Sequence, residues 1–182
     1  MPCSPRFREK YRIETNRLKG WDYATPGYYF VTICAKYRTP WFGHVTEKGI
    51  VLSAIGEIVE QELVKTPRIR SHVSPDTYVV MPNHIHLVIV IGQVDENTVE
   101  TPRRGVSTTK KWRSGTLGAI VNQFKSICTK RIHSAGSKDF SWQSRFYDHI
   151  IMNEKELGNI RAYIQGNPFK WNEDENYLSC DQ

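Results

Sequence analysis

The sequence predicts an α+β fold in which helices pack on an antiparallel sheet, in a ferredoxin-like or split βαβ arrangement. Three observations lead to this prediction. Short runs rich in β-branched and aromatic residues are typical of strands, and longer runs with apolar residues three and four apart are typical of helices. These runs occur in the order strand, helix, two strands, helix, strand, helix.

The first half of the chain supplies three strands and one helix. Residues 28–35 (YYFVTICA) follow a Pro-Gly breaker and predict a strand. Apolar residues then recur at helical spacing from Ser53 to about residue 65, which predicts a helix that starts at Ser53. Residues 77–81 and 84–91 predict two strands joined tightly through a Pro-Asn pair, as in a hairpin.

The second half supplies a loop, two helices and a further strand. Residues 92–114 lack a core pattern and carry many charges, so we expect a mobile basic loop that can close over a ligand. Residues 117–132 predict an amphipathic helix, and residues 140–151 predict an extended segment. Asn153 with Glu156 three residues later predicts a capped helix through Ile164, which Pro168 ends.

Length and composition predict one domain spanning residues 1–182. The chain is 39% hydrophobic, enough for an ordinary core. No run approaches the roughly 20 apolar residues that cross a bilayer, and the first residues are charged, so we expect a cytoplasmic protein without membrane contact. Four scattered cysteines without a CxxC pair predict free thiols rather than a zinc or redox motif.

Positive charge is concentrated in two places, an N-terminal arm (residues 1–25) and the segment from residue 102 to 131, which holds no acidic residue. A polyanion such as nucleic acid is the natural partner of such a segment, although a solvated basic surface is the alternative. The predicted phosphate contacts are Arg103, Arg104, Lys110, Lys111, Arg113, Lys125, Lys130 and Arg131.

Two histidines interrupt the apolar run VVMPNHIHLVIV (residues 79–90). Residues two apart on a strand share a face, so His84 and His86 project side by side, with Cα atoms about 6.5 to 7 Å apart. The intervening Ile85, with Leu87, then points into the core. Two imidazoles on a stiff strand can hold one metal ion, although a structural histidine pair is the alternative reading of HxH spacing alone.

The strand PNHIHLVIV resembles the His-hydrophobic-His strand of the HUH single-stranded DNA nucleases, particularly the IS200-like and REP-associated tyrosine transposases. The run WQSRFYDHIIMNEKELGNIRAYIQGNP (residues 142–168) is similar to the C-terminal signature of the same family. The resemblance implies that Tyr163 is the nucleophile that attacks a DNA phosphodiester. It also implies that Asn167, one helical turn later, joins the two histidines as a metal ligand.

This resemblance implies a metal-dependent enzyme that cleaves and rejoins single-stranded DNA at hairpin or repeat ends through a 5′-phosphotyrosine intermediate. It implies Mg²⁺ or Mn²⁺ as cofactor, single-stranded DNA with hairpin structure as partner, and a homodimer as one assembly, with the tyrosine acting in its own chain or in the other copy. The alternative function is a non-catalytic single-stranded nucleic-acid-binding module derived from a transposase.

Three further residues are candidates for supporting roles. Tyr147 is the rival nucleophile. His149 is a candidate for orienting the site or the DNA, although a histidine bound by a neighbouring side chain is the plainer reading. Trp142 is a candidate for stacking on bases, and core packing is the commoner use of such a residue.

Overall fold

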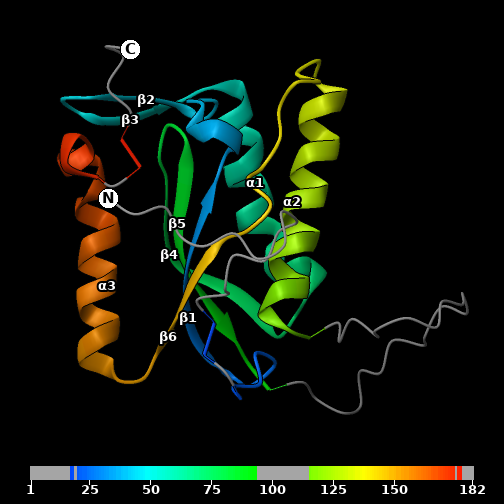
Figure 1. Ribbon diagram of the computed structural model, residues 1–182, viewed down its shortest axis with the longest axis vertical. Helices are drawn as coiled ribbons and strands as arrows, with labels where there is room; N and C mark the ends of the chain where they lie inside the picture. The colour runs from blue at the N-terminus through cyan, green and yellow to red at the C-terminus, as the bar shows by residue number, and fades with distance from the viewer. Residues whose placement is uncertain (1–16, 19, 94–114, 175, 178–182) are drawn as a thin grey trace, which may run out of the picture.

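The computed structural model describes residues 17–18, 20–93, 115–174 and 176–177 (Figure 1). Its centre is a four-stranded antiparallel sheet with the strand order β4-β5-β1-β6. The strands of this sheet are β1 (Gly27–Cys34), β4 (Val73–Val80), β5 (His84–Ile91) and β6 (Tyr147–Ile151). The helices are α1 (Ala54–Ile69), α2 (Leu117–Ser134) and α3 (Glu154–Gly166), with short 3₁₀ segments η1 (Lys36–Arg38) and η2 (Asn167–Glu173). The α+β class expected from the sequence is therefore confirmed.

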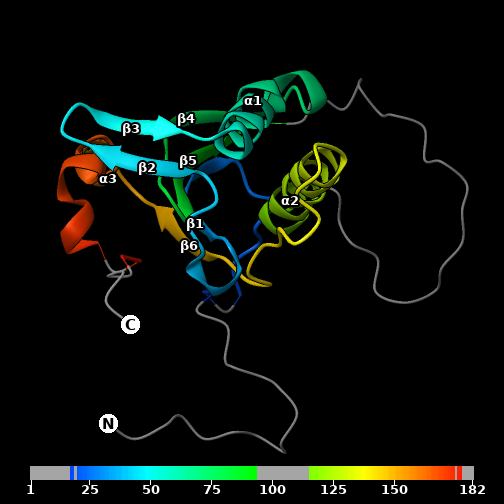
Figure 2. The same ribbon diagram turned by 90° about the horizontal axis from the view of Figure 1, so that it is seen from above.

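The two faces of the sheet carry different helices, as Figure 2 shows. Helices α1 and α2 cover one face, where Ile33, Leu63, Leu87 and Ile120 belong to the larger core cluster. Helix α3 covers part of the other face and packs Leu157 and Ile164 against Val88 of β5 and their neighbours. Because successive strand residues alternate between faces, each strand contributes to both layers.

Each helix begins at a polar side chain that accepts a backbone N–H. Ser53 Oγ accepts from Gly56 at the start of α1, and Thr116 Oγ1 accepts from Ala119 at the start of α2. Asn153 Oδ1 accepts from Glu156 N–H at 2.9 Å at the start of α3, and the Glu156 side chain accepts from Met152 N–H. These contacts satisfy donors that the first helical turn leaves free, and they confirm the helix starts at residues 53 and 153.

A small hairpin between β1 and α1 was not anticipated. Strands β2 (Gly43–Thr46) and β3 (Gly49–Leu52) pair with each other and form a separate two-stranded sheet. Glycine is required at its base, since Gly43 has φ 146° and a Cβ there would lie 2.2 Å from the carbonyl oxygen of Val51. Four-residue strands are short enough that their alternation gives little signal in the sequence.

Other boundaries differ modestly from the predictions. Strand β4 begins at Val73 and passes a register shift between Pro75 and Tyr78, where proline cannot donate a ladder hydrogen bond. Of the extended segment predicted over residues 140–151, only Tyr147–Ile151 is a strand, preceded by an isolated bridge between Ala35 and Trp142. The basic loop predicted over residues 92–114 and the N-terminal arm fall largely outside the described residues. None of the helices in the described part combines the length and apolar character needed to cross a bilayer.

Candidate functional site

The two histidines lie side by side on β5, on the face that carries α3. Alternation sends Ile85 and Leu87 into the large core on the opposite face, while His84 and His86 point away from it. Their ring centroids are 4.4 Å apart, and both side chains are buried. The strand therefore holds two imidazoles in one fixed orientation, as the spacing of the sequence predicts.

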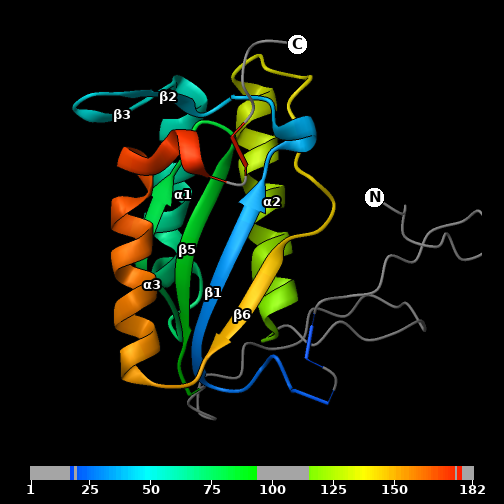
Figure 3. The same cartoon turned by 60° about the vertical axis from the view of Figure 1, so that its left-hand side comes forward.

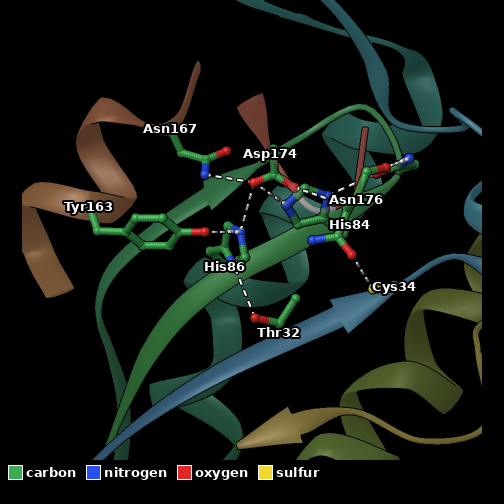
Figure 4. A network of polar contacts seen from close by, with 9 residues as sticks. Thr32, Cys34, His84, His86, Tyr163, Asn167, Asp174 and Asn176 are labelled. Atoms are coloured by element: carbon green, nitrogen blue, oxygen red, sulfur yellow. Dashed lines mark hydrogen bonds and ion pairs between the residues drawn. The ribbon is translucent and has the colours of Figure 1, made fainter. Parts of the chain in front are cut away.

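Hydrogen bonds to the Nδ1 atoms turn both Nε2 atoms toward the same space (Figure 4). His84 Nδ1 lies 2.8 Å from Asn83 Oδ1, and the Asn83 amide nitrogen donates to the Asn176 carbonyl. Because the Asn83 oxygen can only accept, His84 carries its proton on Nδ1 and keeps a lone pair on Nε2. His86 Nδ1 lies 2.9 Å from Thr32 Oγ1 of the neighbouring strand β1.

Asp174, just beyond η2, completes a three-residue cluster with the histidines. Its Oδ2 atom lies 3.8 Å from His84 Nε2 and 3.5 Å from His86 Nε2. The carboxylate is held in place by the Asn167 amide nitrogen at 2.8 Å and the Asn176 backbone N–H at 2.7 Å. One ligand atom from each of His84, His86 and Asp174 lies within 4.8 Å of the others, so the cluster could hold a metal ion.

The protonation states of this cluster suit metal binding. Burial, and to a smaller extent the neighbouring His86, lowers the pKa of His84 to about 3, so its imidazole is neutral at neutral pH. Burial acts to raise the pKa of Asp174, but hydrogen bonds from His86, Asn167 and Asn176 outweigh it and hold the pKa well below its usual range. Neutral imidazole and ionised carboxylate are the forms that coordinate metals.

Tyr163 of α3 lies directly beside the paired histidines. Its hydroxyl oxygen is 3.2 Å from His86 Nε2, and its ring meets the His86 ring edge-on at 5.3 Å between centroids. Phe30 of β1 supports both residues, since it stacks on His86 and meets the Tyr163 ring edge-on. About half of the Tyr163 side chain is exposed, so a substrate can reach it. All of these residues belong to one chain.

Asn167 caps α3 one turn after Tyr163 and is buried. Its amide nitrogen faces Asp174, and its Oδ1 atom is buried without a hydrogen-bond partner among the described residues. The structure thus brings Asn167 next to the histidine cluster, as predicted, but with Asp174 between them. Asp174 was missed in the sequence because it follows Pro168 in an acidic tail that shows no ligand spacing.

The three supporting candidates lie in different environments. His149 Nε2 is 2.6 Å from Glu156 Oε1. His149 is thus bound by a neighbouring side chain, which is the plainer of its two interpretations. Trp142 is partly buried and packs against Phe42, Phe124 and Phe140 of the large core, which is the commoner of the two uses considered for it. Tyr147 is exposed on the same sheet face as the histidines, opposite Thr32 in the register of β6 with β1.

The basic residues of α2 do not lie at this site, because α2 packs on the opposite face of the sheet. The Lys125 ammonium is buried and donates to the carbonyl oxygens of Gln143 and Arg145, so the expectation that it contacts DNA phosphates is corrected. Arg131 is engaged by Glu62 and Gln61 of α1. Lys130 is exposed. The remaining predicted contacts, Arg103, Arg104, Lys110, Lys111 and Arg113, fall outside the described residues.

A tyrosine set against paired histidines on an antiparallel sheet is the arrangement expected of the tyrosine class of transposases. No protein-family model matches the chain. An uncharacterized protein of Haemophilus influenzae is 35% identical over 164 residues, which cover 89% of this chain and 91% of that protein. A second protein of the same organism, provisionally named a REP-associated tyrosine transposase, is 27% identical over 82% of this chain and 74% of its own length.

The fold is shared with a solved structure of a REP-associated tyrosine transposase bound to a REP hairpin. That chain is 21% identical, the TM-score is 0.51, and the match covers 87% of this chain and 74% of the other. The chain described here belongs to the family of REP-associated, IS200-like tyrosine transposases.

Proposed function

We propose that this protein cleaves single-stranded DNA and transfers the strand through a covalent bond to Tyr163. The observation that carries the proposal is the position of the Tyr163 hydroxyl, 3.2 Å from His86 Nε2 and half exposed, beside a cluster that could hold a metal ion. A hydroxyl beside the place where a cation would sit lies within reach of a phosphate that the cation would hold, which is the positioning that nucleophilic attack requires.

The reaction is a transesterification at phosphorus. The Tyr163 oxygen forms a bond to the phosphorus, the bond from phosphorus to the 3′ oxygen breaks, and the 3′ oxygen leaves as a hydroxyl. The DNA then remains joined to Tyr163 through its 5′-phosphate, and the phenol proton passes to a base or to water. Because one ester replaces another, a different 3′-hydroxyl can reverse the step and join a new end.

A phenol with a pKa near 10 is a weak nucleophile at neutral pH, and a phosphodiester repels anions. The residues present fit a divalent cation, since His84 Nε2 is buried without a hydrogen-bond partner among the described residues. Bound there by His84, His86 and an oxygen ligand, the cation would polarise a phosphate oxygen. Mg²⁺ and Mn²⁺ are both candidates, and imidazole ligands suit manganese better.

Two oxygens are candidates for the third ligand. Asp174 Oδ2 already faces both Nε2 atoms. Asn167 Oδ1, the ligand predicted from the sequence, is buried and has no hydrogen-bond partner among the described residues. We propose that Asp174 is the ligand and that Asn167 orients it, because the Asn167 amide nitrogen donates to the same carboxylate oxygen.

The substrate that we propose is single-stranded DNA flanked by a hairpin, since the solved relative with this fold is described as bound to a REP hairpin. Tyr163 and the histidines come from one chain, so a single copy can carry out the chemistry without a homodimer. Lys130 and the basic residues between 103 and 113 remain candidates for contacts to hairpin phosphates away from the reacting one.

The test is covalent capture. The protein is incubated with a labelled single-stranded hairpin and Mn²⁺, and the products are separated under denaturing conditions. We expect a protein–DNA adduct with the wild type, none with Tyr163→Phe, and an undiminished adduct with Tyr147→Phe. Loss of the adduct in Tyr147→Phe alone would move the nucleophile to that residue. DNA binding without any adduct in the wild type would favour the non-catalytic binding module.

A further inference from the structure

Half of the sheet face beside the site has no helix over it in the described structure. Helix α3 lies over β4 and β5, and Figure 3 shows β1 and β6 uncovered on that face. The side chains on that face include the partly buried Phe30 of β1 and the exposed Tyr147 of β6. Tyr147 is the first residue of β6 and is 48% exposed.

The exposed Tyr147 is connected to the site through Phe30, which is partly buried. The Phe30 ring stacks on His86 at 5.5 Å with an interplanar angle of 26°, and it meets the Tyr147 ring edge-on at 6.2 Å. Tyr147 and His86 are both paired with Thr32, one on each side, so their Cα atoms are two strand spacings apart, about 10 Å. Phe30 contacts the rings of Tyr147, His86 and Tyr163, so a group resting on Phe30 and Tyr147 would lie beside the site.

The charged side chains around this surface leave room for a nucleic acid strand to bind without repulsion. Asp148, between Tyr147 and His149, points to the other face, where its carboxylate binds Arg17 at 3.2 Å. The Glu156 carboxylate is engaged by His149 and the Met152 N–H. Neither carboxylate is directed at the two rings, so a backbone phosphate beside them meets no unpaired anion from these neighbours.

We propose that Phe30 and Tyr147 form a stacking platform for the unpaired nucleobase next to the phosphate that Tyr163 attacks. This inference rests on the proposed function and adds a subsite to it. Aromatic rings stack on any base, because every base has a π face, so the platform recognises an unpaired nucleotide rather than a sequence. It fixes the scissile phosphate by holding its neighbouring base and requires that base to be out of a duplex.

The test is a binding cycle in the Tyr163→Phe background, so that cleavage does not enter the measurement. Tyr147→Ala and Tyr147→Phe are each combined with hairpin DNA that is intact or carries one abasic position, placed on either side of the scissile phosphate. We expect Tyr147→Ala to weaken binding of intact DNA by about 5- to 150-fold, the range that loss of one stacked base gives. Tyr147→Phe keeps the ring and is expected to bind within about 2-fold of its parent.

An abasic position at the stacked nucleotide is expected to weaken binding to the parent by a similar factor and to have little further effect in Tyr147→Ala. Met152→Ala, at an exposed residue just beyond β6, is the matched control and is expected to leave binding unchanged. Thermal unfolding checks that Tyr147→Ala remains folded. Additive losses at both flanking positions would overturn the platform even if Tyr163 forms its adduct. If Tyr147→Ala and the abasic position show coupled effects on binding but the wild type forms no adduct, the stacking platform is retained and the proposed cleavage is rejected.

Discussion

The two faces of the central sheet are built from the same strands, but one forms the apolar core and the other carries the polar site. Toward α1 and α2, residues such as Ile85 and Leu87 form a closed apolar core. Toward α3, the alternate residues His84 and His86 form a polar cluster that meets Tyr163. A slip of β5 by one residue would exchange the two sets, so the register that buries the core also fixes the site. Stability and chemistry are thus separable by changing neighbouring residues on one strand.

The largest expected effect is on the polar face. His84→Ala should lower covalent adduct formation by about 10³-fold or more, since loss of a metal ligand removes several kcal/mol of stabilisation of the charge at phosphorus. Adduct yield against time in Mn²⁺, on protein shown to be folded by circular dichroism, measures it. An adduct rate within tenfold of the wild type would remove His84 from the site.

Substitution of the core residue Leu87 should lower stability and leave the chemistry unchanged. Leu87→Ala should lower the free energy of unfolding by about 2–5 kcal/mol, because the removed side chain leaves a cavity in a closed core. Adduct formation per folded molecule should stay within about 2-fold. Urea unfolding and adduct assays on the same sample measure both. A loss of chemistry as large as that in His84→Ala would show that the two faces are not separable.

The buried Lys125 adds a test of the core face through the pH dependence of the free energy of unfolding. Burial lowers the pKa of its ammonium from 10.5 to about 8. Between these two values the unfolded chain binds more protons than the folded one, so this group makes the free energy of unfolding rise with pH. The difference in unfolding free energy, wild type minus Lys125→Met, should rise by at most about 3 kcal/mol between pH 8 and 10.5. A flat difference across this window would contradict a buried ammonium.

The smallest effect concerns the third ligand. Asn167→Ala should weaken Mn²⁺ binding by about 10- to 100-fold, the usual cost of removing a group that orients a ligand, while Asp174→Ala should weaken it more. Calorimetric titration of Mn²⁺ into each variant measures the order. If Asn167→Ala is the more damaging change, Asn167 is itself the ligand, as the sequence resemblance implies.

Much of this molecule could be predicted from local patterns. Strand β5 begins and ends where the apolar run predicts, the three long helices follow from apolar spacing, and Ser53 and Asn153 mark the starts of two of them. The pairing of His84 with His86 follows from alternation alone. The position of Tyr163 beside them required the family motif, because no local pattern states which face of the sheet a distant helix will cover.

What could not be predicted depends on contacts between distant segments. Asp174 reaches the histidines only because Asn167 and Asn176 hold the chain after α3 in place. Helical periodicity places Lys125 on the surface of an amphipathic helix. In the structure, its ammonium group instead donates to two backbone carbonyl groups of the segment before β6. Both outcomes arise from tertiary packing that overrides helical periodicity.

The placement of Asp174 has a practical consequence. The described residues of the short tail that carries its acid group belong to neither core cluster, and Asn83 at the β4–β5 turn anchors that tail through the Asn176 carbonyl. A protease cut after Trp171 would leave the sheet and its helices intact while discarding one oxygen donor. If Asp174 is the metal ligand that we propose, preparations that look equally well folded by spectroscopy would differ in metal uptake according to whether they retain this residue.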